Sequence, residues 1–418
     1  MQAIILAAGR SSRFYPFTNF SHKSLIKILG KSVIEHTILS LKAAEITEII
    51  VVVGKESTIP SLLQDGKHLG VSIQYVVQVE PLGMGNALLL AKEYIHDNFL
   101  LLNAHHVDVA TFITEMKRVL QKDVNGVLLA ETRVATWKYG VLRVKENKVL
   151  DLVEKPKKGE EPSKFCVVGI YLFSPLFFDA LSKTPNDHYQ LEAAIAQFAK
   201  THEVVAVKAW EKTVTLKYPW DILIVKNYLL ENMKEYISPN ASIAKTAEII
   251  GNVYIEDGVK VLEGACIKGP CYIGKNAFIG TKAIVRNDVD IEESAVIGAS
   301  MEIKNTLVQE GATTHSGFIG DSVIGANCKI GGLFCTANVR LDRSVIAVQT
   351  KDETIETELK SLGVLMGDNV RIGTLVSTMP GVIIGKNAII GPSTVVLHSV
   401  RENVKYYTRF QEVIEEQG

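Results

Sequence analysis

The sequence predicts an α/β layered domain followed by a three-sided parallel β-helix. Two observations carry this prediction. Up to about residue 235, short β-rich runs alternate with longer amphipathic stretches, which is typical of a layered domain with a mostly parallel sheet. From residue 240 onward, an aliphatic residue recurs at every sixth position, and stacked six-residue units of this kind form the faces of a β-helix.

Four short aliphatic runs of the first half predict buried strands, at Ile4 to Ala7, Ile49 to Val53, Ile73 to Gln78 and Phe99 to Asn103. Apolar residues at helical spacing predict helices between them, at Ser32 to Ala44 and Met84 to Ile95. Ligands of such sheets bind beyond the carboxyl ends of the strands. The glycine-rich turn after the first strand therefore lies where a ligand site is expected.

The six-residue rhythm of the second half runs without a miss through Ile243, Ile249, Ile255, Val261, Ile267, Ile273, Ile279, Val285, Ile291, Ile297 and Ile303. We expect these side chains to point into the coil and turn residues to form its corners. The pattern falters at Gln309 and returns from Ile319. The stretch Lys351 to Lys360 lacks it and predicts a polar loop that projects from a coil.

The segment Pro219 to Tyr236 has apolar residues at helical spacing and is expected to connect the two halves. Pro239 then marks the boundary. The predicted domains are residues 1–235, with a helical linker at about 219–236, and residues 237–418.

The composition argues against several function classes. Lys+Arg 45 nearly balance Asp+Glu 46 in the 418 residues, so the overall charge favours neither nucleic acid nor an anionic membrane as a partner. No apolar run approaches the roughly 20 residues that span a bilayer. The five cysteines include no C-x-x-C pair, which argues against a structural zinc site. We expect a protein of the reducing cytoplasm.

The turn after the first strand has the residue types that a phosphate chain requires. Small residues around Ala8 and Gly9 let backbone N–H groups approach phosphate oxygens, and Arg13 and Lys23 add two cations. Phosphoryl transfer needs positioning and charge neutralisation more than covalent chemistry from the protein. A glycine turn by itself is weak evidence, because glycine after a strand is usually only a turn.

The whole string from Leu6 to Lys23 resembles the signature of sugar-1-phosphate nucleotidyltransferases. With the hexapeptide half attached, the chain resembles the bifunctional type, which joins a uridyltransferase to a glucosamine-1-phosphate acetyltransferase on a left-handed β-helix. Further matches follow along the chain, at Gln78, Pro81-Leu82-Gly83, Tyr139-Gly140, Glu154-Lys155-Pro156, the strand from Gly169, and Pro219-Trp220-Asp221.

The resemblance implies the roles of the matching residues. Arg13 and Lys23 would contact the nucleotide phosphates, and the N–H groups around Ala8 and Gly9 would hold the nucleotide. Gln78 and Gly83 would bind the base, and a pyrimidine is favoured. The sugar phosphate would be bound by Tyr139, Gly140, Glu154 and Lys155.

The resemblance also implies the ligands and the assembly. The substrates would be a nucleoside triphosphate and a sugar 1-phosphate, with Mg²⁺ as the metal of the family. The β-helix half would use acetyl-CoA and would assemble the chain into a homotrimer.

The chain departs from the family at the metal. His105 stands where a metal-binding Asp is usual, Thr215 stands at the second metal position, and Val167 replaces a pocket asparagine. Imidazole and hydroxyl groups bind Mg²⁺ far more weakly than carboxylates do. Asp108 is the remaining carboxylate nearby, although it is also suited to cap the next helix. His105 and His106 are expected on opposite faces of a strand, so that one of them faces the pocket.

The second half keeps part of the acetyl-transfer set of the bifunctional family. His315 would act as the general base, and Asn338 stands at the matching distance along the chain. Phe318 replaces a tyrosine, and Ser344 falls where a lysine is expected.

Two other function classes stay open beside the leading prediction of an enzyme. A regulatory homologue that binds nucleotide sugars without a metal would also retain Gly9, Lys23 and Glu154. A scaffold whose β-helix only trimerises would bind no nucleotide.

Overall fold

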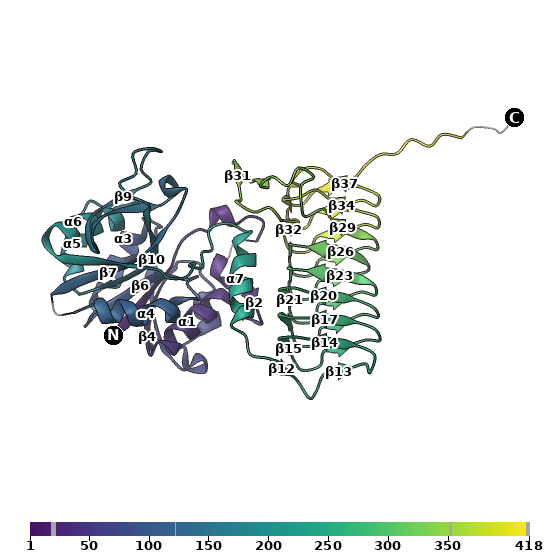
Figure 1. Cartoon of the computed structure of the whole chain (residues 1–418), viewed down its shortest axis with the longest axis horizontal. Helices are drawn as coiled ribbons and strands as arrows, with labels where there is room; N and C mark the ends of the chain where they lie inside the picture. Colours follow the sequence, from purple (N-terminus) through teal and green to yellow (C-terminus); the bar gives the residue numbers. More distant parts are fainter. Residues whose placement is uncertain (18–21, 122, 351–352, 415–418) are drawn as a thin grey trace. The chain divides into compact units, whose positions relative to one another are not determined.

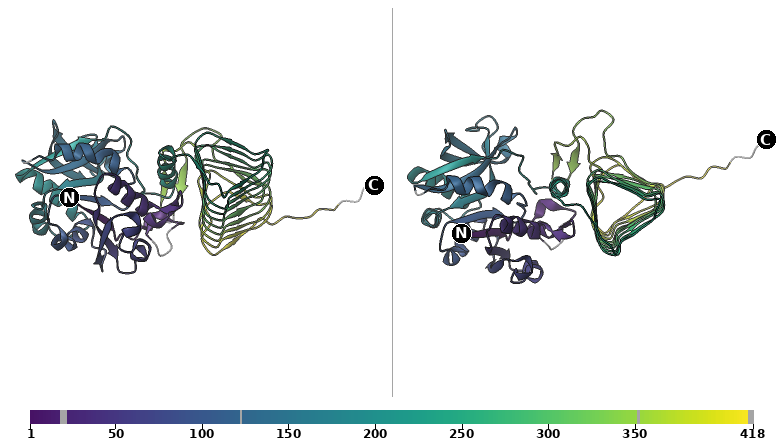
Figure 2. Two further views of the ribbon diagram at one scale, coloured as in Figure 1. Left: turned by 90° about the horizontal axis from the view of Figure 1, so that it is seen from below. Right: turned by 60° about the horizontal axis from the view of Figure 1, so that its bottom comes forward.

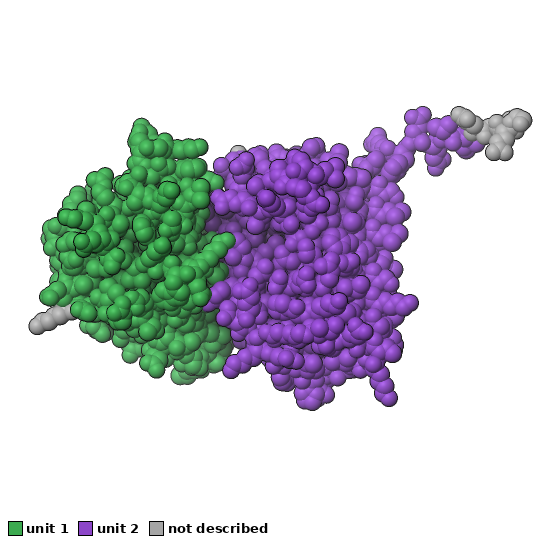
Figure 3. Space-filling model, in the orientation of Figure 1, with its two compact units in different colours: residues 1–11, 20–25, 32–215 green, residues 12–19, 26–31, 216–418 purple. Residues whose placement is uncertain are grey.

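The computed structural model describes the chain except for residues 18–21, 122, 351–352 and 415–418 (Figure 1). The residues that it describes divide into two compact units (Figure 3). The first unit comprises residues 1–11, 20–25 and 32–215, and the second comprises residues 12–19, 26–31 and 216–418. Helix α7 (Asp221–Glu231) and two short early segments therefore belong to the same unit as the repeats.

The first unit is built on one mixed sheet with the strand order β5-β4-β1-β6-β10-β7-β11-β9-β8. The four strands at one side, β5, β4, β1 and β6, are parallel, as predicted. The prediction of a mostly parallel sheet is wrong beyond β6, because β10 runs antiparallel to both β6 and β7, and β8 and β9 form an antiparallel hairpin. The bounds are β1 Gln2–Ala7, β4 Glu48–Gly54, β5 Ser72–Gln78, β6 Phe99–Asn103, β7 Val124–Thr132, β8 Gly140–Lys145, β9 Lys148–Glu154, β10 Phe165–Phe173 and β11 Glu203–Lys208.

Helices cover both faces of this sheet. Successive residues of β1 point to opposite faces, so Ile5 packs with α1, α2 and α4, whereas Ile4 packs with α3, α5 and α6. The predicted helix at Met84 to Ile95 is shorter in the structure, because α3 ends at Leu90 and a 3₁₀ turn follows. The bounds are α1 Val33–Ala43, α2 Ile59–Leu63, α3 Met84–Leu90, α4 Val109–Val119, α5 Phe177–Lys183 and α6 Gln190–Thr201.

The described repeats of the second unit form three parallel sheets that wind into a coil of triangular cross-section (Figure 2). The first sheet contains β12 Tyr236–Ile237, β15 Val253–Ile255, β18 Cys271–Ile273, β21 Val289–Ile291, β24 Leu307–Val308, β27 Val323–Ile324, β32 Val364–Met366 and β35 Val382–Ile384. The second contains β13 Ser242–Ile243, β16 Lys260–Val261, β19 Phe278–Ile279, β22 Val296–Ile297, β25 Thr313–Thr314, β28 Lys329–Ile330, β33 Arg371–Ile372, β36 Ile389–Ile390 and β38 Lys405–Tyr406. The third contains β14 Glu248–Ile250, β17 Cys266–Lys268, β20 Ile284–Arg286, β23 Met301–Lys304, β26 Gly317–Gly320, β29 Phe334–Thr336, β34 Ser377–Thr378 and β37 Val395–Val396.

The aliphatic residues of the hexapeptides stack inside this coil, which confirms the predicted left-handed β-helix. Ile249 pairs with Ile267, 18 residues further on, so three hexapeptides make one coil. Ile303 instead pairs with Ile319, only 16 residues further on. The coil is shorter there, which explains why the rhythm falters at Gln309.

An insertion interrupts the coil between β29 and β32. The stretch predicted as a polar loop, Lys351 to Lys360, is partly wrong, because its described part contains β31 (Thr354–Glu356), which pairs antiparallel with β30 (Ala347–Gln349). Residues 351–352 lie outside the described residues. Val348 and Ile355 are buried, so the hairpin has an apolar face that the charge pattern hides.

Two further segments of the second unit, helix α7 and the turn at Leu29 and Gly30, are hydrogen-bonded to the coil; Lys226 of α7 donates to the Asn305 side-chain oxygen at 3.1 Å. The predicted helix at 219–236 ends at Glu231, and Tyr236 instead begins β12, where its ring contacts that of Tyr254 in a tilted arrangement. The turn at Leu29 and Gly30 is held by the coil, since Asp290 accepts a hydrogen bond from the Leu29 N–H at 2.8 Å.

Within the described ranges, no helix combines the length and the apolar character needed to cross a membrane.

Candidate functional site

The phosphate turn follows β1 and has an open backbone. A Cβ added at Gly9 would meet no heavy atom within 4 Å, so a ligand can approach the main chain there. The backbone N–H of Lys23 donates to the Ser11 hydroxyl at 3.1 Å, which ties the turn to the 3₁₀ segment Lys23–Leu25. The structure thus brings Ala8, Gly9 and Lys23 into one region at the carboxyl end of β1.

The charge of Lys23 acts on two histidine side chains of the first unit. Burial and the Lys23 charge lower the pKa of His22 to about 3. Burial also lowers the pKa of His105 well below its usual range, and the charge of Lys23 lowers it further. Both imidazoles are therefore neutral at pH 7, and the positive potential at Lys23 favours an anionic ligand.

Arg13, the second predicted cation, is exposed in the 3₁₀ segment Ser12–Phe14. This segment belongs to the second unit. The contact of Arg13 with nucleotide phosphates stays a prediction.

Gln78 ends β5 and fixes the turn that carries Gly83. Its side-chain amide nitrogen donates to the Gly83 carbonyl at 3.0 Å and to the Asn86 side-chain oxygen at 2.9 Å. Both amide hydrogens are used, so the oxygen of Gln78 is the end available to a base. Gly83 has φ +104°, and a Cβ there would lie 3.1 Å from the His188 carbonyl oxygen, which explains the glycine.

The predicted sugar residues converge where β8 pairs with β9. Gly140 lies opposite Glu154 in the hairpin, and a Cβ at Gly140 would lie 2.8 Å from Oε2 of Glu154. The Lys155 backbone N–H donates to the Tyr139 carbonyl at 3.1 Å. The Lys155 ammonium donates to the Tyr189 hydroxyl at 3.1 Å. One carboxylate and one ammonium group therefore share this end of the hairpin.

The two adjacent histidines lie beyond the end of β6. Their rings stack with centroids 4.7 Å apart. The prediction that His105 and His106 point to opposite faces of a strand is wrong, because β6 ends at Asn103 and the histidines follow in a turn, where strand alternation no longer applies.

Asp108 stands at the N-cap position of α4, but its side chain makes no capping hydrogen bond, so that expectation is wrong. Its Oδ2 atom instead accepts a hydrogen bond from the Val214 N–H at 2.8 Å. The structure therefore places Asp108 beside the segment that carries Thr215. Among the described residues, Oδ1 of Asp108 and both ring nitrogens of His106 are buried with no hydrogen-bond partner.

This donor set does not fit Mg²⁺. The ion prefers near-octahedral oxygen ligands, whereas the cluster offers two imidazoles and one uncommitted carboxylate oxygen at Asp108. Across the part of the chain that the structure describes, no three His, Cys, Asp or Glu side chains are grouped so as to hold a metal ion. Thr215 adds a hydroxyl group, which is a weaker ligand than a carboxylate.

The predicted acetyl-transfer residues lie on neighbouring coils. His315 is exposed and precedes β26, whereas Asn338 follows β29, which pairs in parallel with β26. A strand rises roughly 3.3 Å per residue, so the two side chains lie at opposite ends of the third sheet, on the order of 15 Å or more apart. At Ser344, the hydroxyl accepts a hydrogen bond from the Arg340 guanidinium at 2.8 Å, so a cation stands beside the position of the missing lysine.

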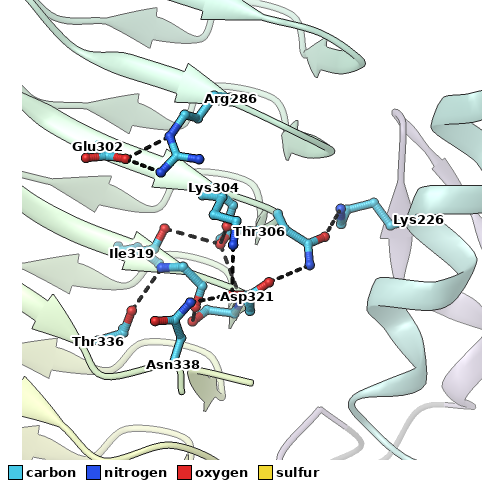
Figure 4. A network of polar contacts seen from close by, with 12 residues as sticks. Lys226, Arg286, Glu302, Lys304, Thr306, Ile319, Asp321, Thr336 and Asn338 are labelled. Carbon is cyan, nitrogen blue, oxygen red and sulfur yellow. Dashed lines mark hydrogen bonds and ion pairs between the residues drawn. The ribbon is translucent and has the colours of Figure 1, made fainter. Parts of the chain in front are cut away.

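The structure also shows a charged network at the third sheet that the sequence analysis missed (Figure 4). Arg286 pairs with Glu302 at 2.6 Å, and Lys304 lies 3.6 Å from the Asp321 carboxylate, which binds Asn338. In the sequence alone, charged residues on the outer face of a coil cannot be told from ordinary solvated surface residues. The signal that could have revealed the network is the recurrence of a basic residue one coil apart, in register, at Lys268, Arg286 and Lys304.

Comparisons with known proteins match both units. The nucleotidyl transferase family matches residues 2–220, and a bacterial transferase hexapeptide family, with six repeats, matches residues 363–398. The chain belongs to the nucleotidyl transferase family. The predicted family and the prediction of an enzyme are therefore confirmed.

Curated relatives align with nearly the whole chain. The bifunctional protein GlmU of Methanococcus vannielii is 32% identical, and the alignment covers 100% of both chains. A bifunctional sugar-1-phosphate nucleotidylyltransferase/acetyltransferase of Sulfurisphaera tokodaii is 31% identical over 96% of this chain and 98% of its own. The solved structure of a putative glucose-1-phosphate thymidylyltransferase from Bacillus anthracis covers 56% of this chain and 97% of its own, with a TM-score of 0.50 and 24% identity. That likeness confirms the fold of the first unit.

Proposed function

We propose that the chain joins a nucleoside triphosphate to a sugar 1-phosphate and releases pyrophosphate. One observation carries the proposal beyond family membership. The backbone N–H of Lys23 donates to the Ser11 hydroxyl, which ties Lys23 to the turn that carries the open backbone at Gly9, and this supports a phosphate site at the end of a strand where such sheets bind ligands. The nucleotidyltransferase domain would cover residues 1–235 and the β-helix domain residues 237–418.

The residues of the first unit support each part of this reaction. An oxygen of the sugar phosphate attacks the α-phosphorus in line, the bond to the bridging oxygen breaks, and pyrophosphate leaves. Lys23, with Arg13, stabilises the charge that spreads over the phosphate oxygens. Glu154 accepts hydrogen bonds from sugar hydroxyls, and Lys155 contacts the phosphate of the sugar.

Mg²⁺ is the ion that the family resemblance implies, but we assign it no protein ligands. His105, His106 and Asp108 do not form a set of hard oxygen donors. The described steps therefore use only the side chains and backbone groups of the chain.

All five cysteines lie among the described residues and are free, which supports a reducing cytoplasm as the place of action.

We also propose acyl transfer from acetyl-CoA to the amine of an amino-sugar phosphate, carried out by the β-helix. His315 takes the proton of the amine as the acyl carbon–nitrogen bond forms and the thiolate of coenzyme A leaves. Asn338 binds the amine, and Lys304, which pairs with the carboxylate that holds Asn338, is a partner for a phosphate.

A homotrimer would complete this second site. His315 and Asn338 of one chain lie too far apart to contact the same amine, so a neighbouring copy has to supply one of them. Closed rings of identical subunits repeat such composite sites. Mixing His315→Ala and Asn338→Ala chains under conditions that exchange subunits should restore part of the acyl transfer that each variant lacks. No restoration would contradict a shared site.

The first activity is tested by pyrophosphate release. Purified protein is incubated with each of the four common nucleoside triphosphates, a panel of sugar 1-phosphates, and Mg²⁺ or Mn²⁺. We expect turnover with at least one pair, most readily with a pyrimidine nucleotide. Nucleotide binding without turnover for any pair would instead support a regulatory homologue, and the absence of nucleotide binding would support a scaffold.

A further inference from the structure

A chain of hydrogen bonds runs from helix α7 to Asn338 (Figure 4). The ammonium group of Lys226 donates to the side-chain oxygen of Asn305 at 3.1 Å, and the Asn305 amide nitrogen donates to Oδ1 of Asp321 at 2.7 Å. The Asn338 amide nitrogen donates to the other oxygen of the same carboxylate. Lys226 is fully buried and Asp321 is 3% exposed, so little water competes for these bonds.

The groups in this chain fix the direction of every bond. Lys226 can only donate, so Asn305 must offer it the carbonyl oxygen and must turn the amide nitrogen toward Asp321. Each oxygen of the Asp321 carboxylate accepts a hydrogen bond, one from Asn305 and one from Asn338, so the carboxylate selects the nitrogen end of Asn338 as well. The carbonyl oxygen of Asn338 is therefore the end that faces away from the network.

Packing around Asn338 restricts its side-chain amide further. A Cβ at Gly320 would lie 2.6 Å from the Phe318 ring and 3.0 Å from the Asn338 amide nitrogen, so these groups leave no room for a larger residue at position 320. A larger side chain at position 320 would therefore displace the Asn338 amide. Lys304 lies 3.6 Å from the Asp321 carboxylate and forms an ion pair with it.

We propose that Asp321 is a positioning residue for the acyl-transfer site, and that together with Asn305 and Lys226 it turns the carbonyl oxygen of Asn338 toward the ligand. The inference rests on the acyl transfer proposed above. An outward carbonyl oxygen accepts a hydrogen bond, so the group that it binds must be an N–H or O–H donor. The amine of the acyl acceptor is such a donor, whereas a phosphate or a sugar ring oxygen is not.

Substitutions can reverse the direction of the hydrogen bond between positions 321 and 338 and can then restore an outward-facing acceptor at position 338. In Asp321→Asn, the new amide nitrogen donates toward position 338, so Asn338 would have to turn its own oxygen inward to accept. We expect kcat/KM for the amino-sugar phosphate to fall about tenfold to a hundredfold, with the loss mainly in KM for this substrate. The KM for acetyl-CoA and pyrophosphate release by the first unit should stay unchanged.

The exchanged pair Asp321→Asn with Asn338→Asp should recover most of this loss. In this variant the amide introduced at position 321 would donate to one oxygen of the new carboxylate, whose other oxygen would again face the ligand as an acceptor. Asp368→Asn is the matched control, because Asp368 is another coil carboxylate that accepts a hydrogen bond, from the Ala326 N–H at 2.9 Å, and lies outside the network. A thermal unfolding curve for each variant reports any general loss of stability.

The outcomes separate the inference from the proposed function. Wild-type protein without acyl transfer to any amino-sugar phosphate would refute the second activity, and the amide orientation is then decided by hydrogen exchange of ¹⁵N-asparagine side chains. The Asn338 signal, assigned by its loss in Asn338→Asp, should be protected in the wild type and unprotected in Asp321→Asn. Active wild type with an equally active Asp321→Asn variant, or with no recovery in the exchanged pair, would overturn the inference.

Discussion

Nδ1 of His106 lies 3.8 Å from Oδ1 of Asp108, and both side chains are buried. This separation is too long for a hydrogen bond, and neither atom has another partner among the described residues. The pair occupies the region where the family resemblance places a metal-binding carboxylate. Buried polar atoms without partners are costly, so the arrangement favours a bound polar ligand or a water molecule between the two groups.

Placing oxygen ligands at the two metal positions should create a stronger Mg²⁺ site. In the double variant His105→Asp with Thr215→Asp, two carboxylates would join Asp108, and we expect half-maximal pyrophosphate release at a lower Mg²⁺ concentration than in the wild type. The neutral pair His105→Asn with Thr215→Asn is the control. An identical Mg²⁺ titration for all three proteins would show that these positions do not face the metal.

Removal of the Lys23 cation should impair chemistry more than folding. We expect Lys23→Ala to lower kcat for nucleotidyl transfer by about 10²- to 10³-fold, because one preorganised charge at the transition state is lost. The melting temperature should change little, since a partly exposed cation contributes little stability. The control is Lys31→Ala, at an exposed lysine that begins β3 (Lys31–Ser32), and this variant should retain full activity. Wild-type turnover in Lys23→Ala would exclude the assigned role.

A methyl group at Gly140 should displace the Glu154 carboxylate. The added Cβ would lie 2.8 Å from Oε2 of Glu154 and 3.0 Å from a methyl carbon of Val167, so the carboxylate has to move. We expect Gly140→Ala and Glu154→Gln each to raise KM for the sugar 1-phosphate at least tenfold, with nucleotide affinity unchanged. If both variants bind the sugar phosphate as the wild type does, Glu154 does not hold the sugar.

Glu192 should make the first unit less stable as the pH rises. Burial, followed by the nearby Glu154 charge, raises the pKa of the Glu192 carboxyl to about 7 from its ordinary value of 4.5. The folded state therefore binds the proton more tightly than the unfolded state, and stability falls as the pH increases from about 4.5 to 7, by up to about 3 kcal/mol. Denaturant unfolding of the wild type and of Glu192→Gln at pH 5 and pH 8 measures this effect. The variant should lack most of this pH-dependent loss, and an equal loss in both proteins would contradict it.

Residues that depend on repeating patterns were predictable from the sequence. Ile255, Ile267 and Val285 occupy the interior of the coil because every sixth residue points inward. The strands from Ile4 and Phe99 were equally clear, since both faces of a central strand are buried. The local pattern of apolar residues is sufficient to predict these strands and the residues inside the coil.

Features that depend on long-range contacts were not predictable. The stacking of His105 on His106 requires the exact end of β6, and the Asp108 bond to Val214 joins residues far apart in the chain. The polar chain through Asp321 depends on the register of successive coils. A local pattern contains no information about which distant backbone amide a side chain meets.

The turn at Leu29 and Gly30 has a practical consequence for any attempt to dissect the protein. It belongs to the second unit, where Asp290 and Glu292 accept its backbone N–H groups, although it precedes most of the first unit in the chain. A fragment that ends near residue 235 would lose these acceptors, and a fragment that begins there would uncover Tyr272 and two buried carboxylates. Separate expression of the halves should therefore yield incompletely folded material, because residues 26–31 are separated from the acceptors that hold them.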